Sequence, residues 1–452
     1  MTAPNQAQHC VAVVGAGPAG LYAANELARA GVHVVVFNRD IKPGGLAEYG
    51  IYHDKHKMKE GLRKQFRQIL AAPNIDYYGN VTVARNGDLT LDDLRQLGFH
   101  AIMVTVGAQG TKWLGIPGED LKGVYHAKDI VYHYNKLPPY SQREYYIGRR
   151  VALVGVGNVM MDLAHWLIRD VKVDYVVAVA RRGPAEVKFS KKEMLPVVCH
   201  IDRQLLNAEI ERVAPVMRSV GQDPDAAKAY ILSAADKGIP PISKTVFAFQ
   251  FLASPKRILG DSQGYVCGLE VEDTTLVRTN GDTKAKGLGT TRVLDVDTVI
   301  FCIGDRVDES VGLPVEWNEF VKSPNPRFPV DGISYEAYDP AAGQPIEGVF
   351  VAGWARKASE GLVGVARKDG ETGAQAVLQY LATLPPQENV EEVLRRVAQR
   401  LAQLGKPVIT KDDWQRLEAI EQQEAARRGL EFFKFDSNEA MLAALHAIPE
   451  PA

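Results

Sequence analysis

Two glycine-rich turns have the residue types and the spacing needed to bind the phosphates of a dinucleotide. The first, Gly15-Ala16-Gly17-Pro18-Ala19-Gly20, follows the apolar run at 11–14. In such a strand–turn–helix unit, the first glycine permits the tight turn, the second lets the backbone approach a pyrophosphate, and the third lets the helix pack against the strand. The free N–H groups and the dipole at the helix N-terminus then favour an anion. We therefore expect a nucleotide site made by Gly15, Gly17, Pro18, Ala19 and Gly20.

A second turn, Gly155-Val156-Gly157-Asn158-Val159-Met160, follows the apolar run at 151–154. Met160 replaces the small third residue, and we expect its large side chain to push helix and strand apart or to tilt the helix. The next predicted strand, 175–180, ends in Arg181-Arg182. Arginine at this place can pair with the 2′-phosphate of NADP, whereas an acidic residue would favour NAD. The alternative is that both arginines simply lie at a solvated strand end.

Asn38 departs from the usual pattern of the first unit. It ends the strand predicted over 32–37, where an acidic residue normally binds the ribose hydroxyls. An amide oxygen can still accept a hydrogen bond, but it lacks the charge that strengthens such a bond. We therefore expect the first nucleotide to be held less tightly or in a different way.

Apolar periodicity predicts the elements that position these residues. We expect helices over 21–30 and 161–168, and strands over 101–108 and 298–305 that close the two nucleotide folds. Further along the chain, we expect a helical segment over 219–243, strands over 244–300 and an amphipathic helix over 386–404. The predicted fold is α/β with two Rossmann-like dinucleotide-binding domains. The second, 108–305, is inserted in the first, 1–107 and 306–452.

Composition narrows the class of protein. The 452 residues carry a formal net charge of -2, so nothing global points to nucleic acid or an anionic membrane. The N-terminus lacks a basic region and the apolar stretch after it is interrupted, so we expect a cytoplasmic protein without a membrane span. The four cysteines form no C-x-x-C motif, which argues against a dithiol redox pair, and we expect them to be reduced and inert.

Further motifs extend the pattern over nearly the whole chain. They are Gly45-Leu46, HKMKEGLRKQF at 56–66, Asn80-Val81, VGAQ at 106–109, IPGEDLKGV at 116–124, GNVMMD at 157–162, RRGP at 181–184, FSKKE at 189–193, Gly353-Trp354, Gly361-Leu362-Val363-Gly364 and DDWQRLEAIEQ at 412–422. In this order, they resemble the adrenodoxin reductase family of ferredoxin–NADP reductases.

The resemblance implies a set of cofactor-binding and catalytic residues. FAD would be bound by the first turn with Asn38, Gly45, Leu46, Val81 and Gly107, and its flavin ring would lie near Gly353, Trp354, Gly361, Leu362, Val363 and Gly364. NADPH would be bound by Gly155, Gly157, Asn158, Val159, Arg181 and Arg182. Three catalytic candidates follow: His56 as a proton relay, with Asp162 and Glu193 near the nicotinamide and flavin. Each has a plain alternative as a solvated or helix-capping residue.

The predicted reaction is electron transfer between NADPH and a one-electron carrier such as ferredoxin. Flavin chemistry bridges hydride and single-electron steps. The family usually has Gly-Pro-Thr-Gly where this chain has Ala358-Ser359-Glu360-Gly361, and a charge at Glu360 would lower the flavin potential. An acidic ferredoxin needs a basic surface, and the cations available in the second domain are Lys188, Lys191, Lys192, Arg203, Arg212 and Arg218. The alternative is a mixed, solvated surface, because acidic residues lie among these cations: Glu186, Glu193, Asp202, Glu209 and Glu211.

Two alternatives to ferredoxin reduction stay open. One is an NADPH-dependent flavin reductase acting directly on a small molecule such as a quinone. The other is a non-turnover FAD-binding subunit of an electron-transfer complex, which the departures at Asn38, Met160 and 358–360 would suit. We expect no metal site and no nucleic-acid partner, and a monomer or a homodimer.

Overall fold

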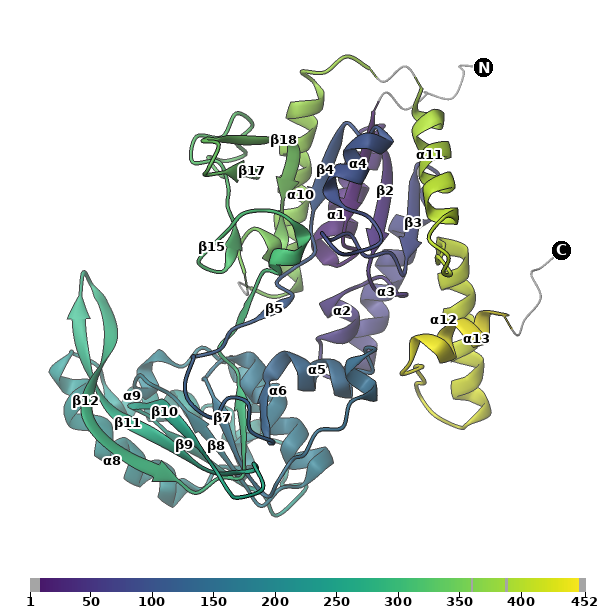
Figure 1. Cartoon of the computed structure of the whole chain (residues 1–452). Coiled ribbons are helices and arrows are strands. Elements are labelled where there is room, and N and C mark those ends of the chain that lie inside the picture. Colours follow the sequence, from purple (N-terminus) through teal and green to yellow (C-terminus); the bar gives the residue numbers. More distant parts are fainter. Residues whose placement is uncertain (1–8, 359–360, 387–388, 447–452) are drawn as a thin grey trace. The chain divides into compact units, whose positions relative to one another are not determined.

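The computed structural model describes residues 9–358, 361–386 and 389–446, so the predicted role of Glu360 lies outside the described residues. The chain divides into two compact units (Figure 1). Unit 1 contains residues up to Thr111, Tyr132–Gln142 and the chain from Gly304, and unit 2 contains Lys112–Val131 and Arg143–Ile303. The assignment of 1–107 with 306–452 to FAD and of 108–305 to NADP stays a prediction.

Unit 1 is built on a six-stranded sheet in the order β17-β18-β4-β1-β2-β3. The strands are β1 (Cys10–Val14), β2 (His33–Asn38), β3 (Ile75–Gly79), β4 (Ala101–Val104), β17 (Glu336–Asp339) and β18 (Gln344–Val351). All neighbours are parallel except β17 and β18. Every residue of β1 is buried, as expected of a central strand covered on both faces.

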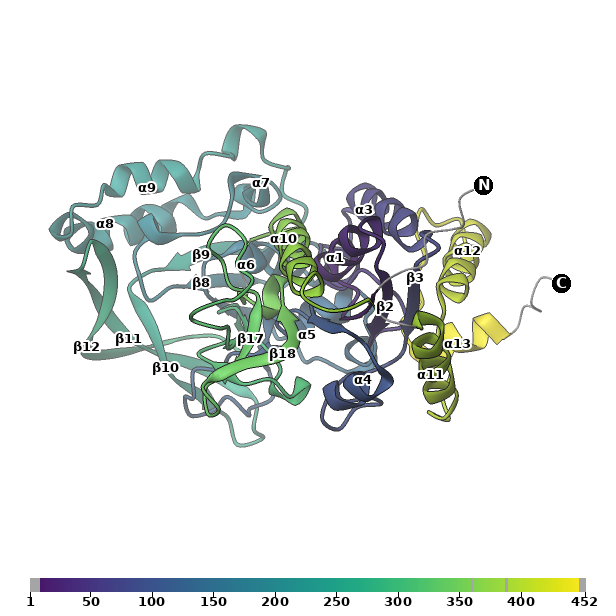
Figure 2. The same ribbon diagram turned by 90° about the horizontal axis from the view of Figure 1, so that it is seen from above.

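The two faces of this sheet carry different helices (Figure 2). Val11 and Val13 of β1 share a core with α1 (Pro18–Arg29), α3 (His56–Leu70), α10 (Val363–Leu381), α12 (Lys411–Arg427) and α13 (Asn438–His446). Cys10, Ala12 and Val14 face the other core, with α4 (Leu91–Leu97) and α11 (Val390–Ala402). The helix predicted over 386–404 is thus confirmed as α11, which packs through Val393, Val397 and Leu401.

Unit 2 is built on a five-stranded parallel sheet in the order β6-β13-β7-β8-β9. The strands are β6 (Val124–His126), β7 (Arg150–Val154), β8 (Tyr175–Val179), β9 (Val246–Gln250) and β13 (Thr298–Phe301). One face is covered by an antiparallel sheet of β10 (Ala253–Gly260), β11 (Val266–Thr279) and β12 (Asp282–Leu294). The other face carries α6 (Asn158–Trp166), α7 (Lys191–Met194), α8 (Arg203–Ser219) and α9 (Pro224–Ile231) (Figure 2). Two Rossmann-like units of the predicted α/β class are therefore present.

Short elements complete the chain. They are α2 (Leu46–Tyr49), α5 (Ala127–Tyr134), β5 (Gly110–Thr111), β14 (Asp305–Arg306), β15 (Val315–Glu316) and β16 (Glu319–Phe320). Among the described residues, no helix is long and apolar enough to cross a membrane.

Helix boundaries differ from the sequence prediction for identifiable reasons. Helix α1 begins at Pro18 and not at 21, because proline at the first helical position loses no hydrogen bond. Helix α6 begins at Asn158 and not at 161, and it ends in a π-helical turn over Leu167–Val171. The helical prediction over 219–243 was too long: α9 ends at Ile231, and the prolines at 240–241 cannot continue a helix.

We predict that Gly20→Ala destabilises unit 1. A Cβ atom at Gly20 would lie 1.9 Å from the Gly15 carbonyl oxygen, so the backbone must shift at a cost of about 2 kcal/mol or more. Gly61 in α3 is the matched control, because a Cβ there would meet nothing within 4 Å. Gly61→Ala should stabilise by up to about 1 kcal/mol through helix propensity. Urea unfolding of both variants measures the difference, and equal effects would contradict the packing argument.

Candidate functional site

The first glycine turn has the geometry that a bound pyrophosphate requires. Gly15 has φ +104, and a Cβ there would lie 2.8 Å from the Thr105 carbonyl oxygen. Gly17 is different: a Cβ would meet nothing within 4 Å, so the space beside its backbone is open. Gly17 is the N-cap residue of helix α1, so no side chain caps the helix N-terminus. Its first N–H groups therefore keep hydrogen-bonding capacity for an anion in that space.

Three further segments converge on the start of α1. A Cβ at Gly45 would lie 3.1 Å from the Gly17 Cα, and one at Gly353 would lie 2.6 Å from the Ala19 Cβ. A Cβ at Gly370 of α10 would lie 2.1 Å from the Ala19 carbonyl oxygen. The run 361–364 forms the uncapped start of α10, with Gly361 at φ +78. Two segments predicted for FAD, at Gly45 and Gly353, therefore lie against the start of α1, and α10 approaches it through Gly370.

Asn38 is largely occupied within the fold. Its Oδ1 accepts from the Ala16 N–H at 3.0 Å, and its Nδ2 donates to the carbonyl oxygens of Asp40 at 2.8 Å and Lys42 at 3.1 Å. The residue is buried, and the Val81 N–H donates to its carbonyl at 2.9 Å. One lone pair of Oδ1 is left to accept from a ribose hydroxyl. The amide thus fastens the end of β2 to the glycine turn, a role that its sequence position did not reveal.

The remaining FAD candidates also lie in unit 1. Leu46 begins α2 directly after Gly45, and Trp354 follows Gly353 in a short 3-10 turn. Gly107 follows β4 with φ +72. Asp369 was missed by the sequence analysis although it accepts from the Gly353 N–H at 2.6 Å and pairs with Arg356. A carboxylate that orients a backbone turn from 16 residues away leaves no local sequence signal.

The second glycine turn repeats this geometry in unit 2. Gly155 has φ +126, and a Cβ there would lie 2.4 Å from the Cys302 carbonyl oxygen. A Cβ at Gly157 would meet nothing within 4 Å, and this N-cap residue of α6 provides no side-chain cap. The Asn158 Oδ1 accepts from the Ser190 N–H at 2.8 Å, whereas Val159 is exposed. Met160 is fully buried, so α6 accommodates a side chain where α1 requires glycine.

The two candidate arginines lie at the end of β8. Arg181 is exposed, and Arg182 Nη1 donates to the Thr283 carbonyl oxygen at 3.4 Å. The nearby Glu186 accepts from the Gly183 N–H at 2.8 Å and from the Gln222 Nε2 at 2.6 Å, so its charge is used within the loop. Both guanidinium groups therefore keep donors for a phosphate.

The three catalytic candidates lie in different units. His56 begins α3 in unit 1, where its ring stacks on Phe432 with centroids 5.1 Å apart. Its Nδ1 is buried and has no partner among the described residues, and burial lowers the pKa of the imidazole. Asp162 lies in α6 and Glu193 in α7, both in unit 2. Their catalytic roles stay predictions.

A buried ionic cluster joins the segment after β2 to the C-terminal tail. Glu48 of α2 accepts two hydrogen bonds from Arg63 at 2.8 and 2.9 Å and pairs with Lys434, and Lys42 pairs with Glu421. Burial alone would raise the pKa of Glu48, but Lys434, Lys42 and Arg63 together hold it well below its usual value. Because Glu48 lies in α2, which directly follows Gly45, this cluster holds the segment that lies against Gly17.

Lys59 is the least stabilised cation of this region. It is buried and donates to the Asn135 Oδ1 at 2.6 Å. Burial, reinforced by the charge of Lys434, lowers the pKa of Lys59 to about 6, so its amine is largely neutral at pH 7. Six basic and acidic side chains are thus packed together, and with Lys59 largely neutral the other five carry a net charge of only +1.

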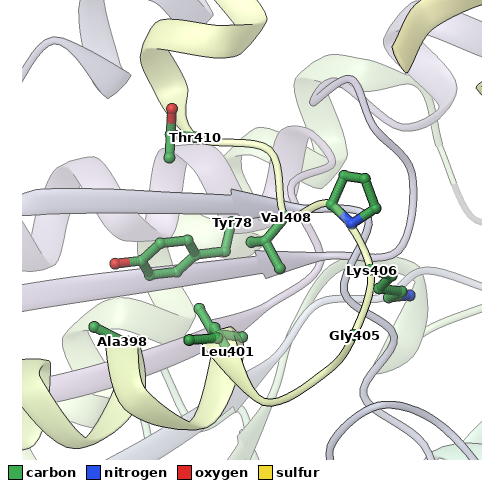
Figure 3. A pocket seen from close by; sticks show the side chains of 9 residues that line it. Tyr78, Ala398, Leu401, Gly405, Lys406, Val408 and Thr410 are labelled. Carbon is green, nitrogen blue, oxygen red and sulfur yellow. The ribbon is translucent and has the colours of Figure 1, made fainter. Parts of the chain in front are cut away.

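Two pockets in unit 1 were not expected from the motifs. Figure 3 shows one of about 560 Å³ where Tyr78 of β3 meets Leu401 of α11 and the loop through Val408. Its lining is mainly apolar, and Lys406 there pairs with Asp88. A smaller pocket of about 180 Å³ is lined by Arg39, Asp40, Asn80 and Thr82 among others, and so adjoins Asn38 and Val81 in sequence. The smaller pocket lies at the end of β2, where the ribose and base of a dinucleotide are expected.

No group of three or more histidine, cysteine or carboxylate side chains that could hold a metal ion occurs among the described residues. The four cysteines are all free. Burial raises the pKa of the Cys10 and Cys302 thiols, which keeps them protonated and unreactive.

Comparison with known proteins agrees with this geometry. Residues 9–197 match the family model of pyridine nucleotide-disulphide oxidoreductases. NADPH-ferredoxin reductase FprA of Mycobacterium leprae is 27% identical over 91% of this chain and 93% of that protein. Human mitochondrial NADPH:adrenodoxin oxidoreductase is 26% identical over 91% of this chain and 87% of that protein. The structure of Mycobacterium tuberculosis FprA in complex with NADPH superposes with a TM-score of 0.80 at 25% identity, covering 97% of this chain and 99% of that one.

Over nearly its whole length, this chain is similar to the adrenodoxin reductase-like ferredoxin–NADP reductases. The recognition made from the sequence is thereby confirmed, together with the fold class. The similarity to these reductases covers both units, whereas the oxidoreductase family model matches only residues 9–197.

We predict that Lys434→Met destabilises unit 1 by about 3 kcal/mol, because it leaves the buried Glu48 carboxylate with incomplete compensation. Urea unfolding followed by tryptophan fluorescence measures the loss. Arg427→Ala is the control, since Arg427 pairs with Glu424 on the exposed surface of α12 and its removal should leave the unfolding midpoint unchanged. A Lys434→Met variant as stable as Arg427→Ala would show that the cluster contributes little.

Proposed function

We propose that the protein is a flavoenzyme that binds FAD in unit 1 and NADPH in unit 2 and passes electrons to an iron–sulfur carrier of the ferredoxin class. The observation that carries this proposal is the duplicated anion site. Each unit has an open glycine, Gly17 or Gly157, beside an uncapped helix N-terminus. In addition, the second site is followed by an arginine pair in place of an acidic residue.

The residues of unit 1 fit FAD. The α1 N-terminus and the backbone at Gly17 and Gly45 would hold the pyrophosphate, and Asn38 with Val81 would lie at the ribose and base. The segments at 353–354 and 361–364 would lie toward the flavin. FAD, when bound, accepts a hydride from a nicotinamide and releases electrons singly, so that the protein has only to bind, orient and tune the two nucleotides.

The residues of unit 2 fit NADPH. The α6 N-terminus would hold the pyrophosphate, with Gly157 allowing the close approach. Arg181 and Arg182 would pair with the 2′-phosphate, which NADH lacks. Asp162 and Glu193 remain candidates for orienting the nicotinamide half, on the strength of the family resemblance.

His56 is the proposed proton carrier. The pKa of its imidazole is lowered by burial, so the ring is neutral at pH 7 and can accept a proton. Its unpartnered buried Nδ1 is the atom available for that proton, while stacking on Phe432 fixes the ring plane.

The proposed carrier is acidic and approaches a basic part of unit 2. Lys188, Lys191, Lys192, Arg203 and Arg218 are candidates, whereas Arg212 is bound to Glu209 through two hydrogen bonds at 2.8 and 2.9 Å. Attraction between such a surface and an acidic carrier speeds association at low salt.

The test is NADPH-dependent cytochrome c reduction by the FAD-loaded protein, with and without an acidic ferredoxin. We expect ferredoxin to stimulate the rate, and the stimulation to fall as salt rises, because the Debye length shortens. Reduction of a quinone at the same rate with no ferredoxin effect at low salt would overturn the choice of partner. Direct reduction of ferricyanide, which needs no docking surface, serves as the control for flavin turnover.

A further inference from the structure

The β11–β12 hairpin reaches back to the arginine loop of unit 2. The buried Thr274 Oγ1 donates to the Arg181 carbonyl oxygen at 2.7 Å, and the Thr283 carbonyl accepts from Arg182 Nη1 at 3.4 Å. A Cβ at Gly183 would lie 3.5 Å from Leu276 Cδ1. Residues of both hairpin strands therefore contact the loop 181–183, so the hairpin is part of the wall of the proposed 2′-phosphate site.

Strand alternation identifies the face of the hairpin that meets this loop. Side chains two residues apart share a face of a strand, so Thr274, Leu276 and Arg278 lie on one side of β11. The first two contact the loop, which places Arg278 as the next residue along the same face. Arg278 is paired in register with Thr283, the residue whose carbonyl accepts from Arg182.

A second contact locates the guanidinium of Arg278. Its Nη1 would lie 3.9 Å from a Cβ at Gly221, in the turn that follows α8. The next residue, Gln222, places its Oε1 3.7 Å from a Cβ at Gly183. That oxygen is buried and has no partner among the described residues. Gly221 and Gln222 thus connect the Arg278 guanidinium to the same loop from the side of α8.

The charge of Arg278 is not used within the fold. The side chain is exposed, and within the part of the chain that the structure describes it makes no hydrogen bond or ion pair. The nearby carboxylate, Glu186, is occupied by Gly183 and Gln222. An unpaired arginine keeps five donors for a phosphate, and it is far better suited to a dianion than to a neutral hydroxyl.

We infer that Arg278 is a specificity-determining residue that binds the 2′-phosphate of NADPH together with Arg181 and Arg182. The inference rests on the proposed function, because it assumes that NADPH binds at the second glycine turn. The nucleotide motif predicts phosphate ligands only in the Rossmann strands and their loops. Arg278 would add a ligand from the antiparallel sheet. It also gives the long hairpin a role in choosing between NADPH and NADH.

Lys284 provides a matched control on the same hairpin. It is an exposed cation paired in register with Val277, so its side chain lies on the opposite face from Arg278. Lys284→Ala therefore removes the same charge from the same hairpin without touching the loop face. Arg278→Lys keeps the charge but loses the planar fork.

The test measures binding of 2′,5′-ADP and 5′-AMP to the FAD-loaded protein by calorimetry. For Arg278→Ala we expect the Kd of 2′,5′-ADP to rise about tenfold, as for loss of one charge-assisted contact, with 5′-AMP unchanged. The Kd of 2′,5′-ADP for Arg278→Lys should lie between those of the parent and Arg278→Ala. The Kd for Lys284→Ala should equal that of the parent. In steady state, Arg278→Ala should raise KM for NADPH about as much while leaving kcat and the KM for NADH unchanged.

Three outcomes would overturn the inference. They are an unchanged Kd for 2′,5′-ADP, equal weakening by Arg278→Ala and Lys284→Ala, and equal weakening of 2′,5′-ADP and 5′-AMP. If the parent prefers 2′,5′-ADP over 5′-AMP and Arg278→Ala keeps that preference undiminished, only the role of Arg278 fails. A parent that binds both nucleotides equally would overturn the proposed NADPH site, and this inference with it.

Discussion

Helix α1 lies closer to its surroundings than any side chain at Gly20 or Gly370 would allow. A Cβ at either residue would lie about 2 Å from a carbonyl oxygen of the turn or of the helix start (1.9 and 2.1 Å). This contact places the helix N-terminus directly beyond the end of β1, with the open backbone of Gly17 beside it. The proposed anion site depends on this contact, and the segments at Gly45 and Gly353 pack against the same end of α1.

The C-terminal tail takes part in the same arrangement. Lys434 and Glu421 reach the segment between Lys42 and Glu48, which carries the Gly44-Gly45 turn. A buried cluster of this kind is a poor source of net stability, since desolvation offsets much of the attraction. Its role here is geometric, because the ion pairs connect α2, α3 and α12 with the segments that carry Lys42 and Lys434. Residues hundreds of positions from the glycine motif thus help to shape the site.

The sequence predicted correctly those features that depend on interactions between residues close together in the chain. The two glycine turns, the arginine pair and the amphipathic α11 depend on neighbours within a few residues, and the structure has them where the sequence placed them. The start of α6 was missed because a helix boundary depends on the cap geometry at Gly157. The hydrogen bonds that the Asn38 side chain makes were not predicted, because its partners, Ala16, Lys42 and Tyr77, come from three separate segments. The Glu48 cluster and the approach of Arg278 to the arginine loop depend on pairings across long stretches of chain, for which one sequence carries no periodic signal.

The central claim is that electrons enter this protein from NADPH through a bound flavin. Its most direct test is an anaerobic titration of the FAD-loaded protein with NADPH and, separately, NADH, followed by the visible absorbance of the flavin. We predict that one equivalent of NADPH bleaches the flavin promptly and that NADH does so far more slowly. A flavin that NADPH leaves oxidised, or that both nucleotides reduce equally well, would contradict the account.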